Sequence, residues 1–317
     1  MIWDIILVLI GFIFLVYGAR VFVDGAASIA SNFKVSKIII GMTIVGFGTN
    51  TPELAVAIKS MLANTPDIVI GNVFGCNIIN ILLILGLGSL IVPLKIKNNT
   101  ISKEIPLCLL FSTALVFLLL DVPINGSMFN EISRSDGIIL LLFFSIFIYY
   151  IIMSARKVST TKDTENPKYT AKKSFMLVFT GLILVITGSN FVVESATSIA
   201  EYFNISQKII AMTIVTFGTA LPEIITTIVS ARKGEHDILI GNIIGSNIFN
   251  ICIVIGLQAS IFGGIQTSSF NYLDLFMFVI ASIVLFFFAK QDHKISRKEG
   301  LLMITGFLAY YSILIFT

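Results

Sequence analysis

Charged residues are scarce in this chain. Asp, Glu, Lys and Arg make up 12% of its 317 residues, about half the fraction of an average soluble domain. Hydrophobic residues make up 56%, and they form blocks of ~18–25 residues, the length that crosses a bilayer as a helix. The shortage of charge excludes a soluble globular protein and predicts an all-α integral membrane protein. The net charge of +3 gives no reason to expect a nucleic-acid partner.

Cysteine and histidine are also rare. Cys76, Cys108 and Cys252 all lie in apolar blocks, which excludes a disulfide framework and indicates buried free thiols. His236 and His293 lie in short polar segments, so no span pairs a nucleophile with a histidine base. We therefore expect neither an enzyme nor a cofactor.

The apolar blocks predict where the chain crosses the membrane. The first block begins near Ile5, without a basic segment before it or a small-residue cleavage site after it, so we expect a retained span and not a signal peptide. Ten spans are predicted, at residues 5–23, 36–61, 68–91, 102–120, 136–154, 175–193, 206–231, 238–262, 271–290 and 298–316.

The polar stretch RKVSTTKDTENPKYTAKKS, residues 156–174, is the one long loop of the sequence. It has no apolar pattern with which to fold by itself, so we expect a linker between two five-helix halves, 1–155 and 175–317. With this loop in the cytoplasm, seventeen of the 21 Lys and Arg residues fall in cytoplasmic segments. The positive-inside rule then places both termini outside the cell.

The two halves repeat each other. A shift of 170 residues pairs FKVSKIIIGMTIVGFGTNTPEL (33–54) with FNISQKIIAMTIVTFGTALPEI (203–224), and DIVIGNVFGCNIINI (67–81) with DILIGNIIGSNIFNI (237–251). Five spans per repeat is an odd number, so the second copy must enter the membrane from the opposite side. Inverted repeats are the architecture of secondary transporters, which bind their substrates at the repeat interface near the bilayer midplane. Duplication of a purely structural module is the alternative.

Glutamates near the middle of two equivalent spans argue against that alternative. Placing Glu53 or Glu223 there costs at least ~2.5–3.5 kcal/mol on insertion scales. The nearest basic residues, Lys59 and Lys208, lie at the outer ends of the same spans. A cation from solution is therefore the natural partner of the two carboxylates.

Prolines and glycines beside the glutamates indicate interrupted helices. Pro52 and Pro222 remove backbone donors and displace the carbonyls near Gly48 and Gly218, so that backbone oxygens can face a cavity. Gly46 eases the same bend.

Further oxygen ligands are predicted nearby. The hydroxyls of Thr49 and Thr219 lie one helical turn before the glutamates, on the same face. The second segment of each repeat adds amide, hydroxyl and thiol groups in a loosely wound helix, those of Asn72, Cys76, Asn77, Asn80, Asn242, Ser246, Asn247 and Asn250. Such an oxygen-rich set suits Ca²⁺ and Na⁺ better than Zn²⁺ or copper. Tight helix packing is the alternative explanation for Gly71, Gly75, Gly241 and Gly245.

These paired segments resemble the α-repeats of the sodium/calcium exchanger family, in the cation/calcium exchanger superfamily. The family motifs read G-T-S-x-P-E and G-N-x-x-G-S-N followed by N or D, and the α-repeats here lie at about 36–91 and 206–262. The resemblance covers all ten spans and fits a prokaryotic plasma-membrane member with a short linker.

The resemblance implies Ca²⁺ extrusion driven by Na⁺ entry through clustered cation sites. It makes Glu53 and Glu223 the central carboxylates and adds flanking ligands from Thr49, Thr219, Asn80, Asn250 and Ser246, with backbone oxygens of Gly46 and Thr216. It makes the first and sixth spans the helices that slide past the remainder. One chain contains both halves of the site, so a monomer suffices.

Four positions depart from the family motifs. Asn50 and Ala220 stand where the family has Ser, Cys76 replaces the Ser that Ser246 retains, and Asn250 stands where many relatives have Asp. Ala220 offers no side-chain oxygen, which puts the number of sodium ions, and sodium itself, in question. Two carboxylates still neutralise one Ca²⁺.

Three functions remain open at this point. Ca²⁺/Na⁺ antiport leads, and coupling to H⁺ or K⁺ is the runner-up, because buried glutamates can titrate. A cation channel is a third, which would need no counter-ion. Outside the site, we expect Asp24 and Glu194 to end their spans at the interface and Arg20 to extend to the inner surface.

Overall fold

The computed structural model describes residues 2–157, 167–203, 216–267 and 272–316. Seven helices in these ranges are long and apolar enough to cross a membrane, which agrees with the predicted all-α membrane protein. They comprise residues Ile2–Phe33, Pro66–Ile91, Thr100–Leu119, Arg134–Arg156, Ala171–Tyr202, His236–Phe262 and Tyr272–Asp292. The predicted span 36–61 is interrupted, and part of the predicted span 206–231 lies outside the described residues.

The described chain forms two compact units, and each unit takes segments from both sequence halves. The first unit contains Met1–Pro52 and Ala155–Asn242, and the second contains Glu53–Ser154 and Ile243–Thr317. The three boundaries each fall inside a helix, after Pro52, after Ser154 and after Asn242.

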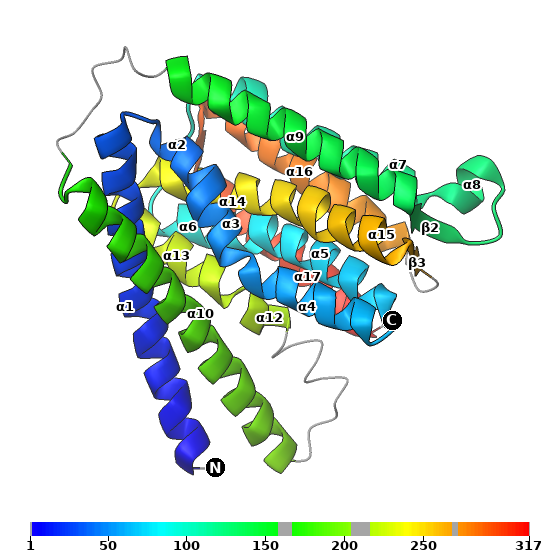
Figure 1. Cartoon of the computed structure of the whole chain (residues 1–317), viewed down its shortest axis with the longest axis horizontal. Coiled ribbons are helices and arrows are strands. Elements are labelled where there is room, and N and C mark those ends of the chain that lie inside the picture. Colours follow the sequence, from blue (N-terminus) through cyan, green and yellow to red (C-terminus); the bar gives the residue numbers. More distant parts are fainter. Residues whose placement is uncertain (1, 158–166, 204–215, 268–271, 317) are drawn as a thin grey trace. The chain divides into compact units, whose positions relative to one another are not determined.

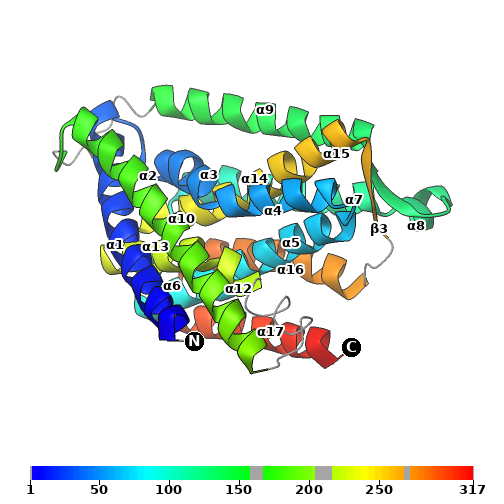
Figure 2. The ribbon, with the colours of Figure 1, turned by 60° about the horizontal axis from the view of Figure 1, so that its bottom comes forward.

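Two long helices dominate the first unit, α1 (Ile2–Phe33) and α10 (Ala171–Tyr202). They lie side by side in both views (Figures 1 and 2). The shorter segments of this unit are α2 (Lys37–Ile40), the π-helical η1 (Gly41–Val45), α3 (Gly46–Thr49), α12 (Thr216–Thr219), α13 (Leu221–Arg232) and the start of α14 (His236–Phe249).

Glycines let α1 and α10 approach within backbone contact. A Cβ atom on Gly11 would lie 2.7 Å from the carbonyl oxygen of Gly188, and one on Gly18 would lie 3.0 Å from that of Gly181. Any larger side chain at these positions would push the helices apart, as at other small-residue membrane interfaces. Phe22 is fully buried beside this seam.

The second unit holds most of the remaining helices. These are α4 (Thr51–Leu62), α5 (Pro66–Ile78), α6 (Gly86–Ile91), α7 (Ile105–Leu119), α8 (Asp121–Asn125), α9 (Arg134–Lys157), the end of α14, α15 (Gly256–Phe262), α16 (Tyr272–Asp292) and α17 (Arg297–Phe316). Three π-helical segments interrupt them: η2 (Ile79–Leu85), η3 (Thr100–Glu104) and η6 (Asn250–Ile255). Phe74 and Phe278 stack at 4.2 Å in its core.

Two short antiparallel strand pairs, which the sequence did not indicate, connect the ends of helices in the second unit. β1 (Leu94–Lys95) pairs with β4 (Lys294–Ile295), and β2 (Asn130–Ser133) pairs with β3 (Gly264–Thr267). In each pair, one strand comes from the first sequence half and the other from the second.

Several helices are longer than the predicted spans. α1 continues to Phe33 and α10 to Tyr202, so Asp24 and Glu194 do not end their helices as expected. Asp24 lies in mid-helix and forms an ion pair with Lys233, at 2.8 Å. Small and polar residues such as DGAASIAS have little hydrophobicity, yet they extend a helix whose neighbour buries them. α9 and α10 also extend into the predicted linker, to Lys157 and from Ala171.

Candidate cation-binding site

The two glutamates lie at the start of half-helices. α3 ends at Thr49, Asn50 forms a turn and α4 begins at Thr51. α12 ends at Thr219, Ala220 follows and α13 begins at Leu221. These are the interruptions that Pro52 and Pro222 predict, since proline fits the first turn of a new helix.

This position reduces the cost of burying the two carboxylates. Glu53 and Glu223 each lie in the first turn of their half-helix and are 1% exposed. The free N–H groups and the dipole at a helix N-terminus stabilise negative charge, typically by ~0.3–1 kcal/mol. Sequence reasoning placed the glutamates in bent spans and did not foresee this contribution.

In the first unit, the hydroxyl of Thr49 is near the carboxylate of Glu223 and makes no hydrogen bond to it. Neither carboxylate oxygen has a hydrogen-bond partner among the described residues. The Thr49 hydroxyl lies 3.1 Å from the carbonyl oxygen of Val45 and 3.2 Å from the amide oxygen of Asn242, to either of which it can donate. Asn50 donates its amide N–H to the carbonyl of Gly46. The surroundings of Glu223 are therefore rich in buried oxygen.

Hydroxyl groups continue from Glu223 along one face of α13. Thr226, Thr227 and Ser230 follow at intervals of three, four and seven residues, the spacing of a single helix face. All three side chains are fully buried, and none of their hydroxyls has a partner in the described part of the chain. Sequence reasoning missed this stripe, although its spacing was readable.

The backbone carbonyls released by the helix breaks accept hydrogen bonds from side chains. Thr51 donates its hydroxyl to the carbonyl of Gly48, at 2.8 Å, and Ser189 donates to that of Gly218, also at 2.8 Å. Both freed carbonyls therefore accept side-chain hydroxyls of the protein.

In the second unit, Glu53 has a thiol neighbour. The sulfur of Cys76 lies 3.9 Å from a carboxylate oxygen of Glu53 and 3.5 Å from the amide oxygen of Asn72. Cys76 is thus within contact distance of the predicted ligand Glu53, as its place in the motif suggests.

Four asparagines of the second unit form a reciprocal network. Asn77 and Asn247 each donate to the other's backbone carbonyl, at 3.3 and 3.4 Å. Asn80 donates its amide N–H to the side-chain oxygen of Asn247, at 2.9 Å, and Asn250 donates to that of Asn77, at 3.1 Å. These donations orient the side chains of Asn80 and Asn250, whose amide oxygens have no partner among the described residues.

Both of these asparagines lie in π-helical segments, Asn80 in η2 and Asn250 at the start of η6. The predicted loose winding is thus present, beginning a few residues after the Gly-Asn steps. π-Helical turns are frequent at functional sites. Ser246, on α14, is fully buried close to Asn250 in sequence.

The glycines of the two second segments behave differently. A Cβ atom on Gly241 would lie 2.4 Å from the carbonyl oxygen of Ile38, so close helix packing explains this glycine. Around Gly71 and Gly75, no described atom lies within 4 Å of such a Cβ. Thr219 is 8% exposed, and the backbone of Thr216 begins α12.

Buried carboxylate, amide and hydroxyl oxygens within interrupted apolar helices define a multi-pass membrane transport protein. Comparison with known proteins agrees with this class. The family described as "Sodium/calcium exchanger protein" matches residues 3–153 and 173–316. The chain belongs to the sodium/calcium exchanger family, whose members are transporters and not enzymes.

Individual relatives match over nearly their whole length. The inner membrane protein YrbG of Escherichia coli is 35% identical, over 97% of this chain and 95% of that protein. The sodium/calcium exchanger MaX1 of Methanosarcina acetivorans is 29% identical, over 99% of both chains. The solved structure of the sodium-calcium exchanger NCX_Mj soaked with 10 mM Na⁺ and no Ca²⁺ superposes with a TM-score of 0.84, at 33% identity over 100% of this chain and 99% of that one.

Proposed function

We propose that the protein is a secondary active antiporter that exchanges Ca²⁺ for Na⁺ across the plasma membrane by alternating access. The observation that carries this proposal is that each unit contains buried oxygens without partners among the described residues: both carboxylate oxygens of Glu223 in the first unit, and the amide oxygens of Asn80 and Asn250 in the second. A buried polar atom without a hydrogen bond is costly. Binding a cation would remove that cost.

The ligands that we propose are the oxygen-bearing residues of both repeats together with one thiol. Glu53 and Glu223 supply the carboxylates. The other side chains are those of Thr49, Thr219, Asn50, Cys76, Asn80, Ser246 and Asn250, and the carbonyls are those of Gly46 and Thr216. Apart from Cys76 this is an oxygen set, the kind that hard cations such as Ca²⁺ and Na⁺ prefer.

Charge balance supports Ca²⁺ as the transported ion. The set contains two ionised carboxylates, and its asparagines are neutral. One Ca²⁺ or two Na⁺ would neutralise it, so the two ions can replace each other without leaving net charge buried. Competition for one oxygen set would then couple their movements in opposite directions.

For the architecture, we propose ten transmembrane helices in two inverted five-helix repeats. Reciprocal contacts between equivalent residues, 170 positions apart, support this arrangement within each unit. Asn77 contacts Asn247 in the second unit, and Ser112 contacts Ser282 there, at 3.3 Å. In the first unit, Gly11 contacts Gly188, which is the repeat equivalent of Gly18. Gly18 in turn contacts Gly181, which is the repeat equivalent of Gly11. When one residue contacts a second, and their repeat equivalents make the same contact in reverse, a two-fold axis relates the two copies.

Orientation and movement complete the proposal. Both termini lie outside the cell and residues 156–174 lie in the cytoplasm, as the distribution of basic residues indicates. α1 and α10 slide as one body, which their close glycine contacts favour. Cations and the surrounding lipid are the only partners that the proposal needs, and a monomer suffices.

The test is ⁴⁵Ca²⁺ uptake into proteoliposomes loaded with Na⁺, K⁺ or choline at the same pH. Uptake from Na⁺-loaded vesicles alone is the expected result, and it should be lost in Glu53→Gln and Glu223→Gln. Glu131→Gln, the same change in strand β2, should transport normally. Uptake from all vesicles, driven instead by a pH gradient, would contradict Na⁺ coupling.

Coupling to H⁺ or K⁺ is the second candidate. Ala220, just before α13, provides no side-chain oxygen where the family motif has Ser. The sodium/potassium/calcium exchanger 1 of Bos taurus is 32% identical, over 46% of this chain and 12% of that protein. A K⁺ requirement on the Ca²⁺ side in the same assay would favour this candidate. A current that persists without any counter-ion would instead indicate a channel.

A further inference from the structure

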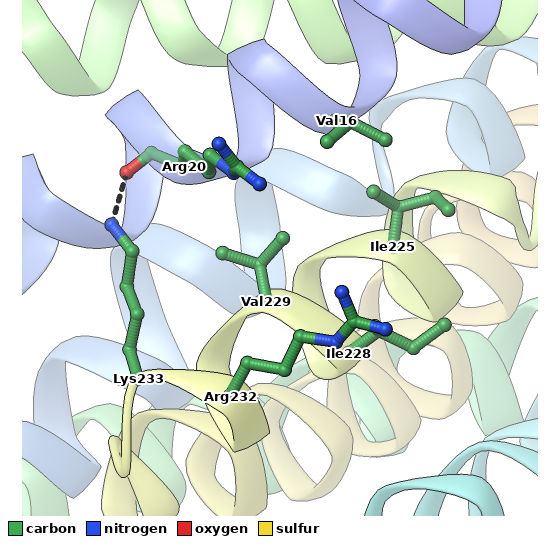
Figure 3. A pocket seen from close by; sticks show the side chains of 7 residues that line it. All are labelled: Val16, Arg20, Ile225, Ile228, Val229, Arg232 and Lys233. Atoms are coloured by element: carbon green, nitrogen blue, oxygen red, sulfur yellow. Dashed lines mark hydrogen bonds between the residues drawn. The ribbon is translucent and has the colours of Figure 1, made fainter. Parts of the chain in front are cut away.

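A cavity of about 470 Å³ lies in the first unit, and neither glutamate is among the residues that line it. Its wall consists of Val16 and Arg20 on α1 and of Ile225, Ile228, Val229, Arg232 and Lys233 on and just after α13 (Figure 3). Its volume is within the ~300–1,000 Å³ of small-molecule sites. The cavity combines an aliphatic wall with three basic side chains.

The basic groups differ in their partners. Lys233 binds the carboxylate of Asp24 and the backbone carbonyl of Arg20, both at 2.8 Å. Figure 3 shows its ammonium group turned to that carbonyl. Asp24 also lies 3.6 Å from Lys168. The carboxylate of Asp24 is therefore shared between two lysines.

The guanidinium groups of Arg20 and Arg232 form no ion pair within the part of the chain that the structure describes. Both side chains are exposed, and both extend beside the aliphatic groups of the cavity in Figure 3. Two unpaired guanidiniums at one apolar surface give the cavity a net positive charge. Arginine also binds phosphate in a bidentate manner that lysine does not reproduce.

One side of the aliphatic wall belongs to an exposed apolar face of α1. Val16 is 38% exposed, and its neighbours Phe12 and Ile13 on the same helix are 42% and 63% exposed. In a membrane-spanning helix, such side chains contact acyl chains. A ligand of this cavity must therefore be amphipathic, with an anionic group at the arginines and an apolar part along α1.

We propose that this cavity binds an anionic phospholipid, with its phosphate between Arg20 and Arg232 and an acyl chain on Val16, Ile225 and Ile228. The phosphate replaces the ion-pair partner that the two guanidiniums lack in the described chain. Inorganic phosphate alone would leave the aliphatic wall uncovered, and a neutral lipid would leave the charge unmatched.

Lipid retention measured by native mass spectrometry of the intact protein tests this proposal. The protein is titrated with phosphatidylglycerol or with phosphatidylcholine of the same acyl chains. We expect one tightly held phosphatidylglycerol. Its affinity should fall about fivefold in Arg20→Gln and again in Arg232→Gln, since each basic residue near a lipid surface contributes ~1 kcal/mol. Lys172→Gln removes a positive charge at the start of α10, outside the cavity, and should have no effect.

Each outcome decides the question. Arg20→Lys and Arg232→Lys should keep the preference for anionic lipid while weakening it, and thermal melting verifies that each variant is folded. Equal retention of both lipids, or affinities that the glutamine variants do not change, would overturn the proposal. Displacement of the lipid by millimolar inorganic phosphate would show that the site accepts free anions and would overturn the assignment to lipid. Because binding is measured and not transport, the result does not depend on the proposed exchange activity.

Discussion

The surroundings of Glu223 in the first unit and of Glu53 in the second differ more than their sequence motifs do. Both glutamates begin a half-helix after a break and are equally buried. Beyond Glu223, the helix continues with Thr226 and Thr227, whereas the equivalent positions after Glu53 are Val56 and Ala57. Duplication has thus kept the backbone arrangement of the two carboxylates and has changed the chemistry around each one.

The two glutamates also differ in whether a sulfur atom lies beside them. Glu53 has the thiol of Cys76 at 3.9 Å, and the repeat equivalent of Cys76 is Ser246. Glu223, which has hydroxyl neighbours, and Glu53, which has a thiol neighbour, should therefore respond differently to substitution and to the choice of ion.

The largest effect is expected from the carboxylates themselves. Glu223→Gln should raise the melting temperature of the cation-free protein, because the change removes a buried carboxyl group that is costly to ionise and whose oxygens have no partner among the described residues. It should also abolish stabilisation by Ca²⁺, which in the wild type reaches ~2.7 kcal/mol at one hundred times Kd.

Thermal melting with and without Ca²⁺ makes this comparison, and Glu53→Gln is its counterpart in the second unit. We expect the gain without cation to be larger for Glu223→Gln. Ca²⁺ stabilisation that survives in either variant would remove that glutamate from the site.

A smaller effect should follow from Thr226→Val, which replaces a buried hydroxyl by a methyl group of the same shape. If the stripe on α13 is dry, the substitution raises the free energy of unfolding by about 1 kcal/mol, because an unsatisfied buried hydroxyl costs ~1–3 kcal/mol. Chemical denaturation measures this change, with Thr180→Val on the exposed face of α10 as the control. A loss of about 1 kcal/mol would instead mean that water satisfies the hydroxyl, and would contradict a dry stripe.

The smallest effect on Ca²⁺ transport is expected from Cys76→Ser, which restores the oxygen that Ser246 provides in the other repeat. We expect the Ca²⁺ affinity to change by less than about threefold, since the carboxylates are retained. Inhibition of ⁴⁵Ca²⁺ uptake by Cd²⁺ should weaken by about tenfold, because a soft thiolate binds soft metals better than a hydroxyl does.

Cys252→Ser serves as the matched control, since Cys252 is an equally buried thiol on η6. Cd²⁺ inhibition that is identical in the wild type and in Cys76→Ser would show that the sulfur makes no contact with the transported ion.

The sequence was sufficient to predict the class of fold and the interrupted helices, because membrane burial leaves few explanations for a carboxylate. Apolar blocks, two glutamates and two prolines predicted interrupted helices, and the breaks lie at Asn50 and Ala220. Motif spacing also predicted Asn80 and Asn250, whose amide oxygens have no partner within the described ranges.

Other features depend on packing between distant segments and were not predictable. The extension of α1 past Asp24 depends on the contact of Gly25 with α10 and on an ion pair with Lys233, 209 residues away. The π-helical winding at Asn80 and the strand pairs likewise follow from neighbours that periodicity does not identify.

The reciprocal contact of Asn77 with Asn247 has a consequence for the history of the chain. Each of these residues touches its own counterpart, which is how a residue on the axis of a homodimer touches its copy in the other subunit. A single half-length ancestor could therefore have formed this network by pairing with itself. Fusion into one gene would then have allowed each copy to mutate separately, so that Cys76 and Ser246 could diverge. The asparagines that meet at the axis are hydrogen-bonded to one another and could not diverge in this way.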